Sequence, residues 1–225
     1  YFGKGALVAL ALDLTIRRGT AGACSLDAVM RELWRRHGQT GVGVPERGVE
    51  AVAGAVSGLD LDGFFAQTLD STEDLDLADL LASVGIGMRL RPNRGPKDLG
   101  GGVEQFAPLT SAVPTLDLRL RPGGTEVVIQ SVISGGAGER AGLAPGDVLL
   151  AVDGLRATPD NLERLVARAA GQTDGVALHL FRRDELMTLT AHPQPANADT
   201  CELMWLEPVA DAVARTRDRW LASRV

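Results

Sequence analysis

The stretch SGGAGERAGLAPGDVLLAVDG, residues 134–154, decides the fold of this chain. Glycine adopts backbone angles that other residues avoid, and proline has a fixed backbone angle φ. Both residues therefore favour turns. The turns predicted here lie at Gly142, Gly146 and Gly154. Between two aspartates, the apolar run Val148–Val152 is typical of a short strand that passes through a core. The stretch therefore predicts a turn-rich β module with a short helix at Ala137–Ala141.

Short alternating runs on both sides of this stretch extend the module. They are Leu116–Leu120, Glu126–Val132, Val148–Val152, Val176–Phe181 and Leu186–Thr190. The second helix signal is Asp160–Ala170, where Leu162, Leu165, Val166 and Ala169 share an apolar face. Five or six strands with two helices within about 80 residues predict a small, partly open β-barrel over residues 113–193.

The first part of the chain, residues 1–92, has a different pattern of apolar residues, and this pattern predicts about five helices. Its apolar residues recur at every third or fourth position, as on the buried face of a helix. Besides the apolar opening, the predicted helices are Ser25–Gly38, Pro45–Val56, Leu61–Leu69 and Leu75–Val84. Ser25 is placed as an N-cap and Pro45 as a first-turn residue. Residues 93–112 contain glycine and proline without a sustained period, which predicts a linker.

The module at residues 113–193 resembles a PDZ domain, particularly the circularly arranged type attached to bacterial proteases. In that type a segment such as ERAGLAPGDVLLAVDG joins the short helix to the central strand. The resemblance implies that a peptide adds a strand beside the second strand, with its terminal carboxylate in a nest of backbone N–H groups. The peptide-binding residues that it implies are Thr115, Leu116, Asp117, Leu118, Leu120, Leu162 and Leu165.

Asp117 departs from the PDZ pattern, because such domains prefer glycine at this position of the loop. A side-chain carboxylate repels an incoming carboxylate, and the loss of glycine restricts the backbone angles that aim the N–H groups. Two interpretations therefore stay open for the module. It either binds peptides in this groove, or it docks on its own protease domain and holds the architecture.

The helical segments YFGKGALVALALDLTIRR (1–18), SLDAVMRELWRRHG (25–38) and GLDLDGFFAQTLDSTEDLDLADLLASVGI (58–86) resemble the C-terminal helices of the glycyl aminopeptidase family. These proteins are zinc metallopeptidases of the gluzincin type that carry a PDZ domain. The tail ADTCELMWLEPVADAVARTRDRWL (198–221) resembles their closing strand and helix. The resemblance implies an α+β chain: a helical C-terminal part of the peptidase domain at 1–92, the linker, the PDZ domain, and a strand and helix at 194–225.

The resemblance also implies zinc in the parent enzyme, held by an HExxH helix and a downstream glutamate, with the HExxH glutamate as general base. This chain contains no such motif, and its histidines, His37, His179 and His192, have no ligand spacing. We therefore expect the chain to bind no cofactor and to be inactive alone. The acidic residues Glu73, Asp74, Asp76 and Asp79 alternate with leucines, which is typical of a solvated helix entry.

One catalytic group of the family falls within the chain. Related enzymes place a tyrosine two residues before a Lys-Gly pair, and its hydroxyl donates a hydrogen bond to the oxyanion. Phe2 holds that position here, and Tyr1 lies one residue earlier. Side chains of adjacent helical residues point about 100° apart, so only one of them can face the metal. Tyr1 is therefore a candidate oxyanion donor, and simple packing is the alternative.

The expected partners are a peptide or protein substrate, a peptide in the PDZ groove and the N-terminal part of the catalytic domain. The net charge of −6 disfavours nucleic acid. The apolar opening Ala6–Leu12 is far shorter than the roughly 20 residues that span a bilayer. Cys24 and Cys201 suggest neither a metal site nor a disulfide scaffold. We expect a soluble protein, cytoplasmic or periplasmic, that is either part of a metallopeptidase or a non-catalytic peptide-binding scaffold derived from one.

Overall fold

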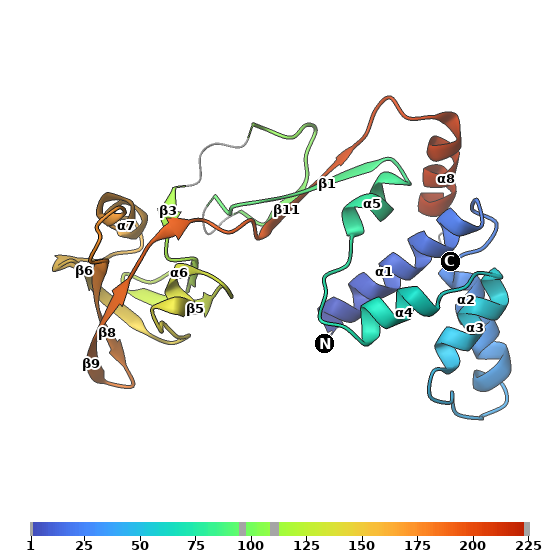
Figure 1. Ribbon diagram of the computed structural model, residues 1–225, viewed down its shortest axis with the longest axis horizontal. Coiled ribbons are helices and arrows are strands. Elements are labelled where there is room, and N and C mark those ends of the chain that lie inside the picture. The colour runs from blue at the N-terminus through green and yellow to red at the C-terminus, as the bar shows by residue number, and fades with distance from the viewer. Residues whose placement is uncertain (1, 95–97, 109–112, 223–225) are drawn as a thin grey trace. The chain divides into compact units, whose positions relative to one another are not determined.

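The computed structural model describes residues 2–94, 98–108 and 113–222. The chain divides into two compact units, coloured along the sequence in Figure 1. One unit combines Tyr1–Arg89 with Leu203–Val225, and the other is Leu90–Glu202. The architecture is a mixture of helices and sheets, which agrees with the α+β class expected from the sequence. The end of the chain is divided differently from the expectation, because residues 194–202 belong with the β module and only the later residues belong with the helices.

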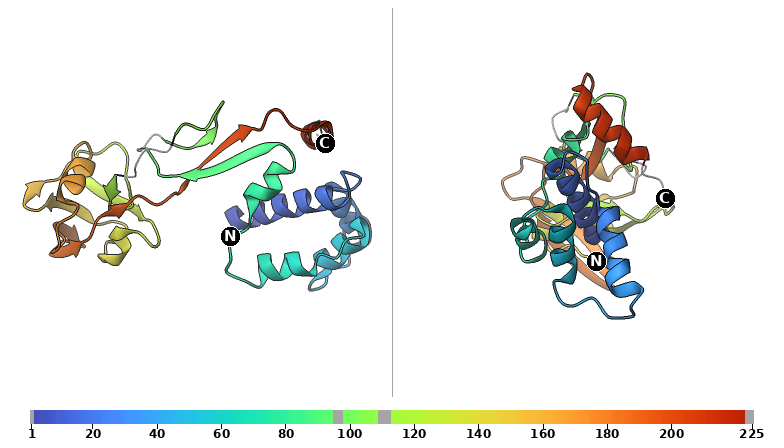
Figure 2. Two further views of the ribbon diagram at one scale, coloured as in Figure 1. Left: turned by 45° about the horizontal axis from the view of Figure 1, so that its top comes forward. Right: turned by 90° about the vertical axis from the view of Figure 1, so that its right-hand side faces the viewer.

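The first unit is built from helices. They are α1 (Phe2–Gly19), α2 (Leu26–Leu33) with a π-helical turn at Trp34–Gly38, α3 (Gly48–Ser57), α4 (Asp62–Leu69), α5 (Leu77–Ala82) and α8 (Asp211–Ala222). The longest helix, α1, contacts both α2 and α5, and α2 lies beside α3 (Figure 2). None of the helices in the part of the chain that the structure describes is long and apolar enough to cross a membrane.

Two apolar clusters hold the helices together. The first joins α1 to α2, α3 and α4 through Leu12, Ile16, Leu61 and Phe65, together with Val29, Leu33, Val52 and Ala53. The second joins α1 to α5 through Ala11 and Leu14 against Leu77, Leu80, Leu81 and Val84, with Trp220 of α8 packed against it. Because residues three or four apart share one face of a helix, α1 can serve both clusters with different residues.

The helix boundaries follow local chemistry that the periodicity alone does not show. Ser25 lies at the N-cap of α2 as predicted, although its side chain makes no capping hydrogen bond. The helix predicted from Pro45 begins only at Gly48, because Arg47 has a left-handed backbone with φ 56°. The helix predicted from Leu75 begins at Leu77, where the Asp76 carboxylate accepts a hydrogen bond from the Asp79 N–H at 3.1 Å.

The second unit contains an antiparallel sheet with the order β4-β5-β6-β8-β9, in which β7 also pairs with β6. The strands are β4 (Leu118–Leu120), β5 (Val127–Val132), β6 (Val148–Val152), β7 (Leu155–Arg156), β8 (Val176–Arg182) and β9 (Glu185–Ala191), and the helices are α6 (Ala137–Arg140) and α7 (Leu162–Ala169). The sheet does not close on itself among the described residues, since β4 and β9 are its two edges. Ile129, Leu149 and Leu178 are fully buried in its core.

Two small sheets complete the architecture. β3 (Pro114–Thr115) pairs with β10 (Gln194–Pro195), and the strand order of the other sheet is β1 (Ile86–Arg91), β11 (Thr200–Trp205), β2 (Gly101–Gly102). The strand predicted at Leu116–Leu120 is shorter than expected and begins at Leu118. Asp117 has a left-handed backbone with φ 54°, which separates β4 from β3. The predicted linker 93–112 holds β2, and its residues 95–97 and 109–112 lie outside the described residues.

An ion pair between the buried Asp147 and the half-buried Arg182 closes the turn that precedes β6. The Arg182 guanidinium donates to both carboxylate oxygens of Asp147, at 2.8 and 2.7 Å, and the Ala144 N–H donates to one of them at 2.9 Å. Asp147 is 1% exposed. Burial opposes ionisation of this carboxyl, but the bonds from Arg182 and Ala144 outweigh it and hold the pKa of Asp147 below its usual value.

The Arg182→Met variant tests this pair, because it leaves the Asp147 carboxylate without its cation. We expect the free energy of unfolding to fall by about 2 kcal/mol at neutral pH. The native pKa of Asp147 lies below its unfolded value of about 3.9, so the pair stabilises the fold above that pH. The stabilisation is lost as the pH falls through the native pKa, and the difference between variant and parent should shrink in acid.

Urea unfolding followed by far-ultraviolet circular dichroism, at neutral and at acid pH, measures both effects. The matched control is Arg164→Met, which removes an exposed arginine of α7 in the same unit. Equal stability of the two variants at neutral pH would contradict the role of the Arg182 to Asp147 pair.

Candidate peptide-binding groove

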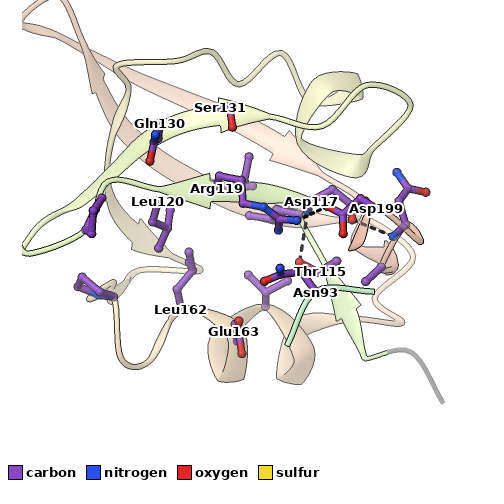
Figure 3. Close-up of a pocket in the computed structure, with 17 residues that line it drawn as sticks. Asn93, Thr115, Asp117, Arg119, Leu120, Gln130, Ser131, Leu162, Glu163 and Asp199 are labelled. Atoms are coloured by element: carbon purple, nitrogen blue, oxygen red, sulfur yellow. Dashed lines mark hydrogen bonds and ion pairs between the residues drawn. The ribbon is translucent and has the colours of Figure 1, made fainter. Parts of the chain in front are cut away.

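A groove of about 320 Å³ runs between β4 and α7 in the second unit (Figure 3). Its β4 side is formed by Leu118, Arg119, Leu120 and Pro122, and its α7 side by Pro159, Leu162, Glu163 and Val166. One end is lined by Asn93, Thr115, Leu116, Asp117, Ala196, Asn197 and Asp199. Of the peptide-binding residues predicted from the sequence, all except Leu165 line this groove.

The β4 strand offers the groove a free backbone edge, because it is the edge strand of its sheet. The Asp117 carbonyl accepts from the Ile133 N–H at 3.0 Å, and the Arg121 N–H donates to the Val128 carbonyl at 2.8 Å. Alternate residues of an antiparallel strand bond to the same neighbour, so Leu118 and Leu120 direct their backbone groups to the opposite side. That unpaired side can accept an extended peptide as an additional strand.

The walls of the groove are apolar. Leu162 and Val166 lie one turn apart on α7 and are 7% and 2% exposed, and Leu118 and Leu120 are half-buried opposite them. Leu165 was predicted for this wall, and the structure places it instead with Val152 and Leu155 at another pocket. Both residues share the broad apolar face of α7, but at 100° per residue Leu165 and Val166 fall on opposite sides of Leu162, and the groove lies on the Val166 side.

Asp117 shapes the end of the groove with its backbone and its side chain. Its N–H donates to Thr115 Oγ1 at 3.2 Å, and its carboxylate accepts from the Asn197 N–H at 3.1 Å (Figure 3). The Leu116 carbonyl accepts from the Gly138 N–H at 2.8 Å. Asp117 is 7% exposed, so its carboxylate is part of the packed loop. The Asp117 N–H, one of the groups that a terminal carboxylate would need, is thus already bonded within the loop.

Gly136 lies directly behind this loop. A Cβ atom at this position would lie 2.5 Å from the Asp117 Cβ and 2.8 Å from the Ile133 carbonyl oxygen. Only glycine therefore lets the start of α6 approach the Asp117 loop this closely.

A buried cation supports the same end of the groove. The Arg91 Nε donates to Glu202 at 2.5 Å, and the rest of its guanidinium bonds to both carboxylate oxygens of Asp98. Asn93, which lines the groove, donates from Nδ2 to the Asp98 carbonyl at 2.8 Å and to Thr200 Oγ1 at 3.0 Å. The position of the Asn93 side chain is thus tied to the Arg91 cluster.

Arg91 and Asp98 stay ionised over the ordinary range of pH. Its guanidinium holds the pKa of Asp98 far below the usual range of an aspartate, and the N–H groups of Arg94 and Gly100 add to the effect. The bonds to Asp98 and Glu202 raise the pKa of Arg91 in turn. The Arg91 to Asp98 pair therefore has a structural role, and neither of its members exchanges a proton near neutral pH.

The other residues singled out in the sequence do not converge on a second site. Tyr1 lies outside the described residues, and Phe2 is the first residue of α1 with 97% of its surface exposed. Asp79 forms an ion pair with Arg18 at 2.6 Å. His37 Nδ1 lies 3.2 Å from the Val42 carbonyl oxygen, whereas His179 lies on β8.

The described residues do not fit a zinc site. No three histidine, cysteine, aspartate or glutamate side chains gather in a ligand arrangement within 2–94, 98–108 and 113–222. Cys24 and Cys201 are both free and half-buried, and burial raises the pKa of the Cys201 thiol. No catalytic step can therefore be assigned to a metal held by these side chains.

Comparisons with known proteins identify a PDZ domain and a similarity to a peptidase-family protein. A protein-family model described as a PDZ domain matches residues 128–183. Among solved structures, the chain is similar to an aminopeptidase N family protein from Idiomarina loihiensis, with 30% sequence identity and a TM-score of 0.78. This similarity covers 96% of the chain and 36% of that protein, so the chain spans about a third of the relative's length.

Two further solved structures are less similar to the chain. The HtrA-type protease AlgW with a decapeptide is 20% identical, with a TM-score of 0.33, and the match covers 38% of this chain and 31% of that one. The HtrA3 PDZ domain bound to a phage-derived ligand is 15% identical, with a TM-score of 0.30, over 40% of this chain and 88% of that one. No match to a curated protein sequence was found.

Proposed function

We propose that this chain is the C-terminal portion of a PDZ-containing zinc metallopeptidase of the gluzincin, aminopeptidase type, which hydrolyses N-terminal peptide bonds. The observation that carries the proposal is the similarity to the aminopeptidase N family protein over 96% of the chain. A match of this extent includes both the helical unit and the PDZ-like unit. Because the chain covers 36% of that relative, the remaining part of a peptidase would lie in additional polypeptide.

An exposed apolar surface on the helical unit supports the need for additional polypeptide. A depression of about 450 Å³ lies among α1, α2, α3 and α4, with Val8, Leu12 and Leu26 in its lining. Three further lining residues, Met30, Val49 and Leu69, are 56%, 42% and 55% exposed. Contiguous apolar surfaces of this kind usually mark an interaction site. In the proposed enzyme this surface packs against the N-terminal part of the catalytic domain.

The catalytic roles are divided accordingly. Zinc and its ligands belong to the additional polypeptide, because the described residues bring no ligand set together. Tyr1 contributes the hydroxyl that donates a hydrogen bond to the oxyanion of the reacting peptide bond. Phe2, which has no hydroxyl, occupies the alternative position. The substrate is a peptide or protein, and a second peptide binds in the groove between β4 and α7.

A second candidate function is a non-catalytic, peptide-binding scaffold derived from such a peptidase. The open edge of β4 favours it, since strand addition at this edge needs no catalytic residue. The two candidates differ in one property: whether the longer polypeptide hydrolyses peptides.

The Met30→Glu variant tests the apolar surface. Met30 is 56% exposed, so the isolated chain should keep its stability within about 0.5 kcal/mol, whereas a charge at this place should oppose docking of an apolar partner. We expect binding to the separately expressed upstream polypeptide to weaken at least tenfold, measured by analytical ultracentrifugation. The matched control is Arg31→Gln, which changes the charge of the exposed neighbouring residue by the same amount. Equal binding by both variants would contradict the docking role.

The Tyr1→Phe variant of the longer polypeptide tests the catalytic role. Loss of one oxyanion donor should lower kcat by about two to three orders of magnitude, measured with peptides that carry a chromogenic leaving group. Phe2→Leu is the control and should leave kcat unchanged. Unchanged turnover in Tyr1→Phe would remove Tyr1 from the site, and absence of hydrolysis by the unmodified longer polypeptide would favour the scaffold.

A further inference from the structure

We propose that the groove between β4 and α7 binds an internal, extended peptide segment with a basic side chain, and that it disfavours a free C-terminal carboxylate. This inference rests on the peptide-binding part of the proposed function and specifies the chemistry of the peptide. It depends on three features of the described residues: the covered end of the groove, the charges in its lining and the free edge of β4.

The chain itself covers the end of the groove. β10 pairs with β3 in the register Gln194 to Thr115 and Pro195 to Pro114, which brings the following residues to the Asp117 loop. There the Asn197 N–H donates to the Asp117 carboxylate, and Asp199 forms an ion pair with Arg119 (Figure 3). An incoming chain end would meet these groups where a carboxylate needs free N–H donors.

The charges in the lining favour a cation. The lining contains three carboxylates, those of Asp117, Glu163 and Asp199, and one guanidinium, that of Arg119, which is bonded to Asp199. A ligand carboxylate would therefore enter a negative field, whereas a lysine or arginine side chain would be attracted. Glu163 is exposed on α7 beside the apolar wall, so it can pair with a ligand cation without burying a charge.

The β4 edge sets the geometry of the segment. Three residues of strand span about 10 Å, so Leu118–Leu120 can pair with only the middle of an extended peptide, whose two ends continue beyond it. Alternate residues of an added strand point to the same face. In a peptide that runs antiparallel to β4, an apolar side chain between Leu120 and Leu162 is therefore followed, two residues on, by the side chain that faces Glu163. The preferred motif is an apolar residue, any residue, and then lysine or arginine.

The test uses the 225-residue chain and three fluorescent peptides. The first is a capped, amidated peptide with the core Leu-Thr-Arg, the second has Glu in place of Arg, and the third ends in Arg-Thr-Leu with a free carboxylate. Fluorescence anisotropy should show the first peptide binding at least threefold more tightly than either of the others. This magnitude corresponds to one solvent-exposed ion pair, of at most about 1 kcal/mol, with repulsion added for the second and third peptides.

Charge reversal at Glu163 sharpens the test. Glu163→Arg should reverse the preference, so that the Glu peptide binds more tightly than the Arg peptide. Glu163→Gln should remove it, and the control Glu185→Gln, at an exposed position of β9, should leave it unchanged. Tighter binding of the free carboxylate, equal binding of all three peptides, or no binding at all would overturn the inference. None of these outcomes bears on hydrolysis by the longer polypeptide, so a failure here is distinguishable from failure of the proposed peptidase.

Discussion

The ion cluster of Arg91 with Asp98 and Glu202 is the constraint on which the architecture depends. The chain passes between its two units at residues 89–90 and again at 202–203, and Arg91 and Glu202 lie just beside these two crossings. Their side chains are 6% and 3% exposed, so the guanidinium would be costly to bury without both carboxylates. The ion pair between Arg91 and Glu202 therefore holds the first residues of the second unit beside its last residues.

The groove depends on this closure through a chain of short contacts. Asp98, held by Arg91, accepts from Asn93 through its carbonyl, and Asn93 lines the end of the groove. The segment that leads to Glu202 supplies Asn197 and Asp199, which bond to the Asp117 loop and to Arg119. The same residues that close the unit thus decide what can enter the groove. A carboxylate terminus finds its place covered, and the open edge of β4 remains available to an internal segment.

The sequence predicts much of the fold, because local chemistry decides it. Val148–Val152 forms β6 with the predicted bounds, and α6 begins at Ala137 as its glycine-rich surroundings indicate. Boundaries fail where a single residue adopts an unusual backbone. The left-handed angles of Arg47 and Asp117 shorten a helix and split a strand, and no periodicity of apolar residues reveals such angles.

Only part of the groove could be predicted from the sequence, because local patterns do not show how a helix is turned or which distant residues meet. Six of the seven predicted groove residues line it, and Leu165 does not, because the pattern of apolar residues on α7 does not say which part of its face points to β4. The Arg91 to Glu202 pair joins residues 111 positions apart, and Asn197 lies 80 positions from Asp117, whose carboxylate it bonds. Contacts over such separations depend on the tertiary structure, and neither residue type nor spacing indicates them.

The proposed function requires that this chain completes a metallopeptidase whose metal ligands lie in additional polypeptide. Metal analysis of a polypeptide extended before Tyr1, combined with an assay for release of N-terminal residues, tests this requirement. We expect one zinc ion per extended polypeptide and hydrolysis that a chelator abolishes and added zinc restores, with neither property in the 225-residue chain. A folded extended polypeptide that binds no zinc and releases no residue would contradict it.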